Sequence, residues 1–79
     1  MILIDTPRWH GGYCWSHLVS DTSEDELHAF ATRIGLKAAW FQGDHYDVRD
    51  GRRMEALRAG ATQVRPRDVL AALKARGLR

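Results

Sequence analysis

The segment CWSHLVSDTSEDELHAFATRIG, residues 14–35, decides the fold class because it places a strand directly before an amphipathic helix. Residues 14–20 alternate in character, so we expect a strand with Trp15, His17 and Val19 on one face. Ser23 and Glu26 have the spacing of a capping box, which predicts the start of the helix. Apolar residues then recur at helical spacing as far as Gly35, namely Leu27, Phe30, Ala31 and Ile34.

The flanking segments continue the alternation of strands and helices. We expect strands over residues 2–4, 38–42 and 62–64, a second helix between Asp50 and Gly60, and a third between Pro66 and Gly77. From residue 14 onward this order is typical of crossover units around a parallel sheet. The predicted fold class is α/β, with a small three- or four-stranded, mostly parallel sheet and three helices.

Length and composition restrict the class of protein. With 79 residues, 44% of them apolar and 28% charged, we expect one compact α/β domain over residues 1–79. A chain this short buries a smaller fraction of its surface on folding than a larger domain does. We therefore expect a ligand or formation of a homo-oligomer to add stability. One cysteine excludes an internal disulfide and a cysteine-based zinc site. The first residues lack the pattern of a signal peptide, and we expect a cytoplasmic protein that does not bind membranes.

A polar segment, Asp44-His45-Tyr46-Asp47, follows the predicted strand over residues 38–42. Carboxylates and an imidazole together bind hard or borderline metals, or divide the roles of general acid and general base. The alternative is a turn in which the aspartates cap backbone groups and Tyr46 packs. The sequence leaves both interpretations open.

Histidines from two other elements extend this candidate site. If His17 on its strand and His28 on the first helix face one crevice, they meet His45, Asp44 and Asp21 there. We therefore expect the three histidines and Asp44 to act as acids, bases or metal ligands. Such a set suits zinc, manganese or iron, but its spacing matches no standard motif. A divalent metal and a simple packing role for each histidine both remain open.

Arg52 and Arg53 are expected in the first turn of the second helix, where the helix dipole disfavours cations. A phosphate bound there would take backbone N–H bonds and a forked guanidinium contact. The alternative is that both arginines pair with neighbouring carboxylates. With Tyr46, Asp47 and Asp21, the two arginines form the expected binding residues.

Three features near the ends of the chain also have competing explanations. Trp9, Tyr13 and Trp15 cluster around a glycine pair, where they either stack on a nucleobase or fold over the sheet. Asp5 either caps the following turn or reaches into a site, and we expect the turn. Arg79 belongs to a basic flank expected on solvated surface.

The segments MILIDTP, SHLVSD, ELHAFATRIG and FQGDHYDV resemble a family of short bacterial and phage proteins catalogued as a domain of unknown function. The resemblance covers nearly the whole chain. It depends most on Ser16-His17, Leu27-His28 and the segment from Asp44 to Asp47. It implies a shared site without an assigned chemistry. Family members often carry a second aspartate where this chain has Thr6, which weakens the case for a carboxylate pair there.

The leading hypothesis is a phosphate-directed hydrolase of nucleotides or phosphodiesters. One alternative is a non-catalytic module that binds a nucleotide or nucleic acid. Another is a phage or host accessory protein that acts through a protein interface, with the polar cluster structural. These functional hypotheses depend on one geometric expectation, that histidines distant in sequence lie together with Asp44 in a single pocket. The structure tests this expectation.

Overall fold

The structure, a computed structural model that describes residues 1–79, begins with a long β-hairpin. β1 (Ile2–Asp5) and β2 (Arg8–His10) both pair antiparallel with β3 (Tyr13–Ser20). The two-residue connection is Gly11-Gly12, with φ angles of 62° and 85°. Both angles are positive, as the tight turn of a two-residue hairpin requires, and glycine adopts them without strain.

Two short strands complete the sheet. β4 (Tyr46–Arg49) pairs antiparallel with β3, and β5 (Thr62–Val64) pairs parallel with β1. Leu18 of β3 is paired with Ile4 on one side and Tyr46 on the other, so β1 and β4 flank β3. The predicted mostly parallel sheet is therefore wrong, because only one of the four strand pairs is parallel. The Gly11-Gly12 turn closes a hairpin between β2 and β3, whereas the sequence did not lead us to expect a strand over residues 8–10.

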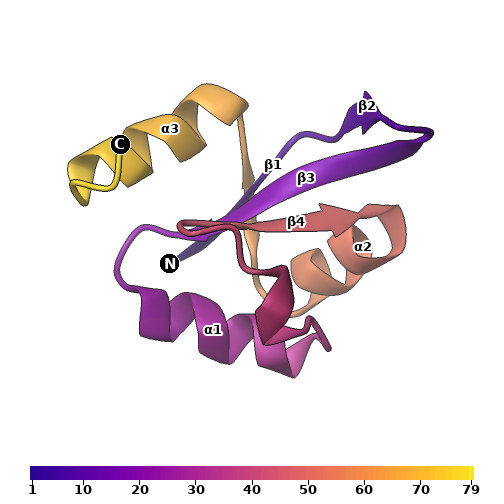
Figure 1. Ribbon diagram of the computed structural model, residues 1–79, viewed down its shortest axis with the longest axis horizontal. Helices are drawn as coiled ribbons and strands as arrows, with labels where there is room; N and C mark the ends of the chain where they lie inside the picture. Colours follow the sequence, from indigo (N-terminus) through magenta and orange to yellow (C-terminus); the bar gives the residue numbers. More distant parts are fainter.

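The three predicted helices are confirmed, and they cover both faces of the sheet (Figure 1). α1 (Glu24–Arg33) and α2 (Asp50–Arg58) lie on one face, and α3 (Pro66–Ala75) lies on the other. The larger core cluster fills the first interface, and a smaller one packs α3 on β1 and β3 through Leu3, Val19, Val69 and Leu73. None of these helices is long and apolar enough to span a membrane.

The start of α1 shows half of the predicted capping box. The Ser23 hydroxyl accepts the backbone N–H of Glu26 at 3.1 Å, as expected. The Glu26 carboxylate instead accepts the Ser20 hydroxyl and the N-terminal amine. Ser20, fully buried, in turn accepts the backbone N–H groups of residues 22 and 23, so it fixes the turn between β3 and α1.

The strand predicted over residues 38–42 is also wrong. Residues Ala38–Trp40 form a short 3-10 helix, η1, and the strand lies further on, at β4. The reason is burial, because Tyr46 and Val48 are each only 1% exposed whereas Trp40 is 41% exposed. These two residues supply the alternation of a half-buried strand within a polar segment. Asp44 and His45 consequently precede a strand rather than follow one.

Candidate metal centre

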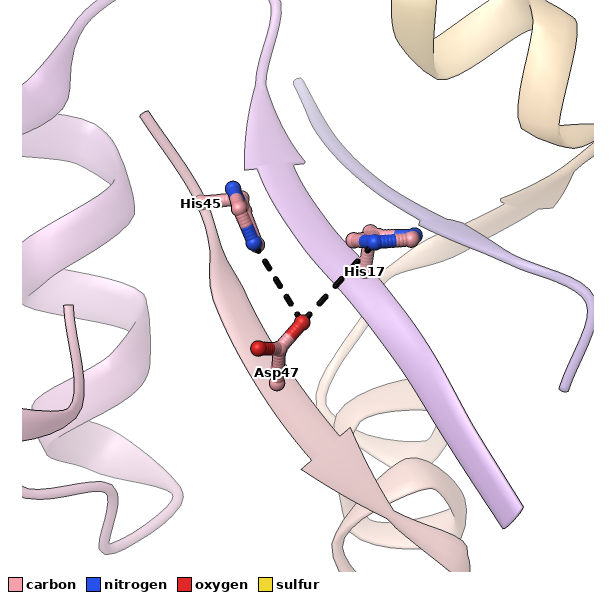
Figure 2. Close-up of side chains that lie close together, drawn as sticks. All are labelled: His17, His45 and Asp47. Carbon is pink, nitrogen blue, oxygen red and sulfur yellow. Dashed lines mark ion pairs between the residues drawn. The ribbon is translucent and has the colours of Figure 1, made fainter. Parts of the chain in front are cut away.

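Three polar side chains converge on the sheet face that α3 covers (Figure 2). His17 on β3 lies directly opposite Asp47 on β4, and His45 precedes Asp47 by two residues, which puts it on the same face. Asp47 Oδ1 lies 3.8 Å from His17 Nε2 and 3.3 Å from His45 Nε2. The two imidazole rings meet edge to face, with centroids 5.0 Å apart. Both rings thus present Nε2 to one carboxylate oxygen.

Each histidine is held by a second carboxylate at its other nitrogen. Asp5, only 1% exposed, accepts the backbone N–H of His17 at 2.7 Å and contacts its Nδ1 at 2.8 Å. Asp44 contacts His45 Nδ1 at 2.7 Å. A carboxylate accepts hydrogen bonds but does not donate them, so each Nδ1 carries a proton. In the neutral rings, both Nε2 atoms therefore carry lone pairs.

This arrangement has an electrostatic consequence at Asp47. Two imidazole lone pairs directed at a carboxylate repel it unless a cation, either a proton or a metal ion, lies among them. The hydrogen bond with Asp5 raises the pKa of His17 above its usual value, and the negative charge of Asp47 acts in the same direction. The site therefore attracts positive charge.

Arg79 anchors the carboxylate beside His45. Its Nε donates to Asp44 Oδ2 at 2.8 Å, and its Nη2 donates to Oδ1 at 3.2 Å. This forked contact, followed by the bond from His45, lowers the pKa of Asp44 to about 2. The last residue of the chain is thereby tied to the segment before β4.

We expect Arg79→Gln to raise the pKa of Asp44 toward its ordinary value of 3.8, because the first cause of its depression is removed. A carboxylate whose pKa is lower in the folded state stabilises the fold above its unfolded pKa, and this contribution is lost as pH falls through the folded value. In the wild type the Asp44 contribution should therefore be lost progressively as pH falls from about 4 to about 2, whereas the variant, with an Asp44 pKa closer to 3.8, should have a smaller contribution to lose. Carboxyl chemical shifts followed from pH 6 to 2 measure the change, and an Asp44 pKa that does not move would contradict this role of Arg79.

The three side chains can hold a metal ion with little movement. One ligand atom from each of His17, His45 and Asp47 lies within 4.8 Å of the others. Ligands about 2.0–2.1 Å from a tetrahedral zinc ion are separated by about 3.3–3.4 Å. The His45–Asp47 distance of 3.3 Å matches this separation, whereas His17 Nε2, 3.8 Å from Asp47 Oδ1, must move closer. Metal-binding histidines usually donate their other N–H to a carboxylate, as Asp5 and Asp44 allow here. Two imidazoles and one carboxylate leave a coordination position open for water or substrate.

The centre opens into two adjoining pockets. One, of about 360 Å³, is lined by Arg8, Trp9, His10, Trp15, His17 and Asp47. The other, of about 170 Å³, shares Arg8 and His17 and adds His45, Asp5, Arg79 and residues of α3. Arg8 lines both pockets and forms no ion pair, so its guanidinium is free to bind an anion beside the centre.

The sequence profile of a family described as "Protein of unknown function (DUF4031)" matches residues 2–76. The chain belongs to this family. The family resemblance predicted from the sequence is thereby confirmed. No curated protein and no solved structure matches the chain at a significant level. The function of this DUF4031 domain must accordingly be inferred from its geometry.

The structure brings together four of the predicted site residues, namely His17, Asp44, His45 and Asp47. The expectation that His28 joins them is wrong. His28 on α1 lies on the opposite face, where its Nδ1 is 2.7 Å from the Tyr46 hydroxyl and its ring packs on Phe41. Alternation along β4 directs Tyr46 into the core, away from its two polar neighbours. These contacts are those of a packed histidine.

The other predicted binding residues lie outside the centre. Asp21 binds the N-terminal amine at 2.8 Å, at the end of the β1–β3 pair remote from Asp5. Arg52 donates to the Ile34 carbonyl at 2.8 Å and lines a third pocket. Arg53 bonds to Gln63 on β5. The two guanidinium groups therefore contact different segments of the chain, and a shared phosphate site at the start of α2 stays a prediction.

Asp5 and Arg79 belong to the cluster although sequence reasoning assigned them elsewhere. Asp5 reaches His17 because β1 and β3 pair antiparallel, and the Gly11-Gly12 turn was the available signal for that pairing. Arg79 reaches Asp44 because α3 returns along the sheet to the start of β4. No local pattern in the sequence indicates this second contact.

Proposed function

We propose that the protein is a metal-dependent hydrolase of phosphodiesters, in which His17, His45 and Asp47 hold a zinc ion. The proposal rests on one observation: the Nε2 atoms of both imidazoles point at the same oxygen of Asp47. The Nδ1 atom of each ring is held by a separate aspartate. Asp5 and Asp44 fix the rings and increase their basicity, which strengthens metal binding.

The open coordination position supplies the chemistry. Zinc with one free position acidifies a bound water and polarises a phosphoryl oxygen. In hydrolysis the attacking water gives up a proton as its oxygen forms a bond to phosphorus, the bond from phosphorus to the leaving oxygen breaks, and the leaving oxygen takes up a proton. Negative charge grows on the phosphoryl oxygens during this step. Arg8, free of ion pairs at the junction of the two pockets, is placed to stabilise that charge.

The test begins with protein freed of metal by EDTA and then titrated with zinc. We expect one zinc ion per chain, a rise in melting temperature, and zinc-dependent hydrolysis of bis(p-nitrophenyl) phosphate. His45→Ala should lose all three responses. His28→Ala, which removes an imidazole from the opposite face, is the matched control and should retain them. Absence of stoichiometric zinc binding in the folded wild type would overturn the proposal.

A second candidate function is phosphate binding without turnover. It is favoured by the free guanidinium of Arg8 and by Trp9, which is 75% exposed at the rim of the larger pocket. Under this alternative, a phosphodiester binds and Arg8→Ala weakens that binding, but no product forms at any zinc concentration. Product formation that requires His17 and His45 favours the hydrolase instead.

A further inference from the structure

The pockets around the candidate centre are parts of one groove that crosses the sheet. A third pocket, of about 410 Å³, extends from η1 over β4. It shares Trp15 and Asp47 with the 360 Å³ pocket, which in turn shares Arg8 and His17 with the 170 Å³ pocket. The groove therefore runs from η1, past His17 and Asp47, to the side of α3. The candidate centre lies in its middle, with open space on either side.

Unpaired cations lie across the groove beside the centre. Arg8 on β2 and Arg49 on β4 are both paired in register with Trp15 on β3, so the three side chains form a row on one face. The next row on that face is His17 with Asp47. Neither arginine of the first row forms an ion pair. Two free guanidinium groups thus face the groove one row from the centre.

Aromatic side chains accompany these cations. Tyr13 and Trp15 follow each other on the same face of β3, and the two rings meet edge to face with centroids 6.2 Å apart. Tyr13 is 52% exposed, and the guanidinium of Arg49 lies over its ring at 4.3 Å. Trp9 is exposed still further; it pairs in register with Cys14, so it belongs to the other face of the hairpin and reaches the 360 Å³ pocket only at its rim. Exposed rings at the tip of a hairpin contribute little to the core, so their surface is available to a ligand.

We propose that this groove binds a single-stranded nucleic acid, with bases stacked on Trp9 at its rim and on Tyr13 beside it at the hairpin tip, and with backbone phosphates held by Arg8 and Arg49. Exposed aromatic rings next to guanidinium groups suit the bases and phosphates of an unpaired strand. A duplex hides its base faces, so it leaves these rings without partners. A mononucleotide fills one side of the centre only. The placement of a scissile phosphodiester at the zinc rests on the proposed function, whereas binding of the strand does not.

Binding is measured in EDTA, so that it does not depend on the metal centre. Fluorescence anisotropy of labelled dT12 and U12 at low salt should give saturable binding, with tighter binding of either strand than of a duplex of the same length or of unlabelled dTMP in competition. Trp9→Ala and Tyr13→Ala should each weaken binding about 5- to 100-fold, the usual effect of losing one stacked base. Both rings are exposed, so the variants should remain folded.

Arg8→Ala should also weaken binding and reduce the slope of log affinity against log salt by about 0.7, the value for one phosphate contact on a single strand. Arg67→Ala is the matched control, since it removes the same charge from an exposed position of α3 outside the groove. Equal losses in both arginine variants would overturn the proposal, as would binding of dTMP as tight as that of dT12. Strand binding that survives without zinc binding would overturn only the hydrolase, and zinc-dependent hydrolysis without strand preference would overturn only this inference.

Discussion

Asp47→Asn is expected to lower zinc affinity by at least about 100-fold. Removing a residue that only hydrogen-bonds to a metal ligand already lowers metal affinity about 10- to 100-fold, and Asp47 is itself a proposed ligand. The substitution keeps the size of the side chain but removes the charge between the two Nε2 atoms. An amide oxygen is a weaker ligand than a carboxylate, and the amide nitrogen cannot bind zinc. Phosphodiester hydrolysis should fall with the loss of bound metal. The side chain of Asp47 is half exposed, so the melting temperature of the metal-free variant should stay near that of the wild type.

Competition with a chromophoric zinc chelator measures this affinity. Asp50→Asn provides the matched control, because it makes the same change three residues further on, at the exposed start of α2. That variant should bind zinc as the wild type does. Unchanged affinity in Asp47→Asn would show that zinc, if bound, is held elsewhere, and the centre built on His17 and His45 would have to be abandoned.

The sequence predicts the helices better than the sheet. α1 can be predicted from signals within its own segment: Ser23 caps its start, apolar residues recur at helical spacing, and Gly35 follows its end. β4 has no such local signal, because its two buried residues, Tyr46 and Val48, alternate with Asp47 and Arg49 in a strand of only four residues. Whether two strands pair parallel or antiparallel depends on segments far apart in the sequence, so a local pattern rarely predicts it. A tight Gly11-Gly12 turn was the local evidence that β3 closes a hairpin rather than starts a crossover.

The same division applies to the candidate centre. Asp44, His45 and Asp47 attract notice because they are neighbours in sequence, and they remain neighbours in space. His17 joins them through strand register, which a parallel-sheet prediction could not supply. Period-two alternation explains the separation of Tyr46 from its two polar neighbours, since adjacent residues of a strand face opposite sides. Knowledge of the strand would have excluded His28, whose partner is Tyr46.

Asp5→Asn is expected to reduce zinc affinity about 10- to 100-fold although Asp5 is not a ligand. Asp5 is a positioning residue that uses one oxygen for the backbone N–H of His17 and the other for its Nδ1. Asparagine has one acceptor oxygen, so its amide group must face one of these two positions as a donor. If the oxygen keeps the backbone N–H, the amide donates to Nδ1 and selects the ring form with the proton on Nε2. That form cannot bind zinc through Nε2.

The loss of a charge-assisted hydrogen bond at so buried a position should also lower the free energy of unfolding by about 1.5 to 3 kcal/mol. Destabilisation alone does not distinguish a positioning role from a packing role. The nitrogen chemical shifts of the His17 ring do, because they report which nitrogen carries the proton. We expect the proton on Nδ1 in the wild type and on Nε2 in Asp5→Asn, both free of metal and below their melting temperatures. If the proton stays on Nδ1 while affinity falls only as far as unfolding explains, Asp5 supports the fold and does not set the ligand.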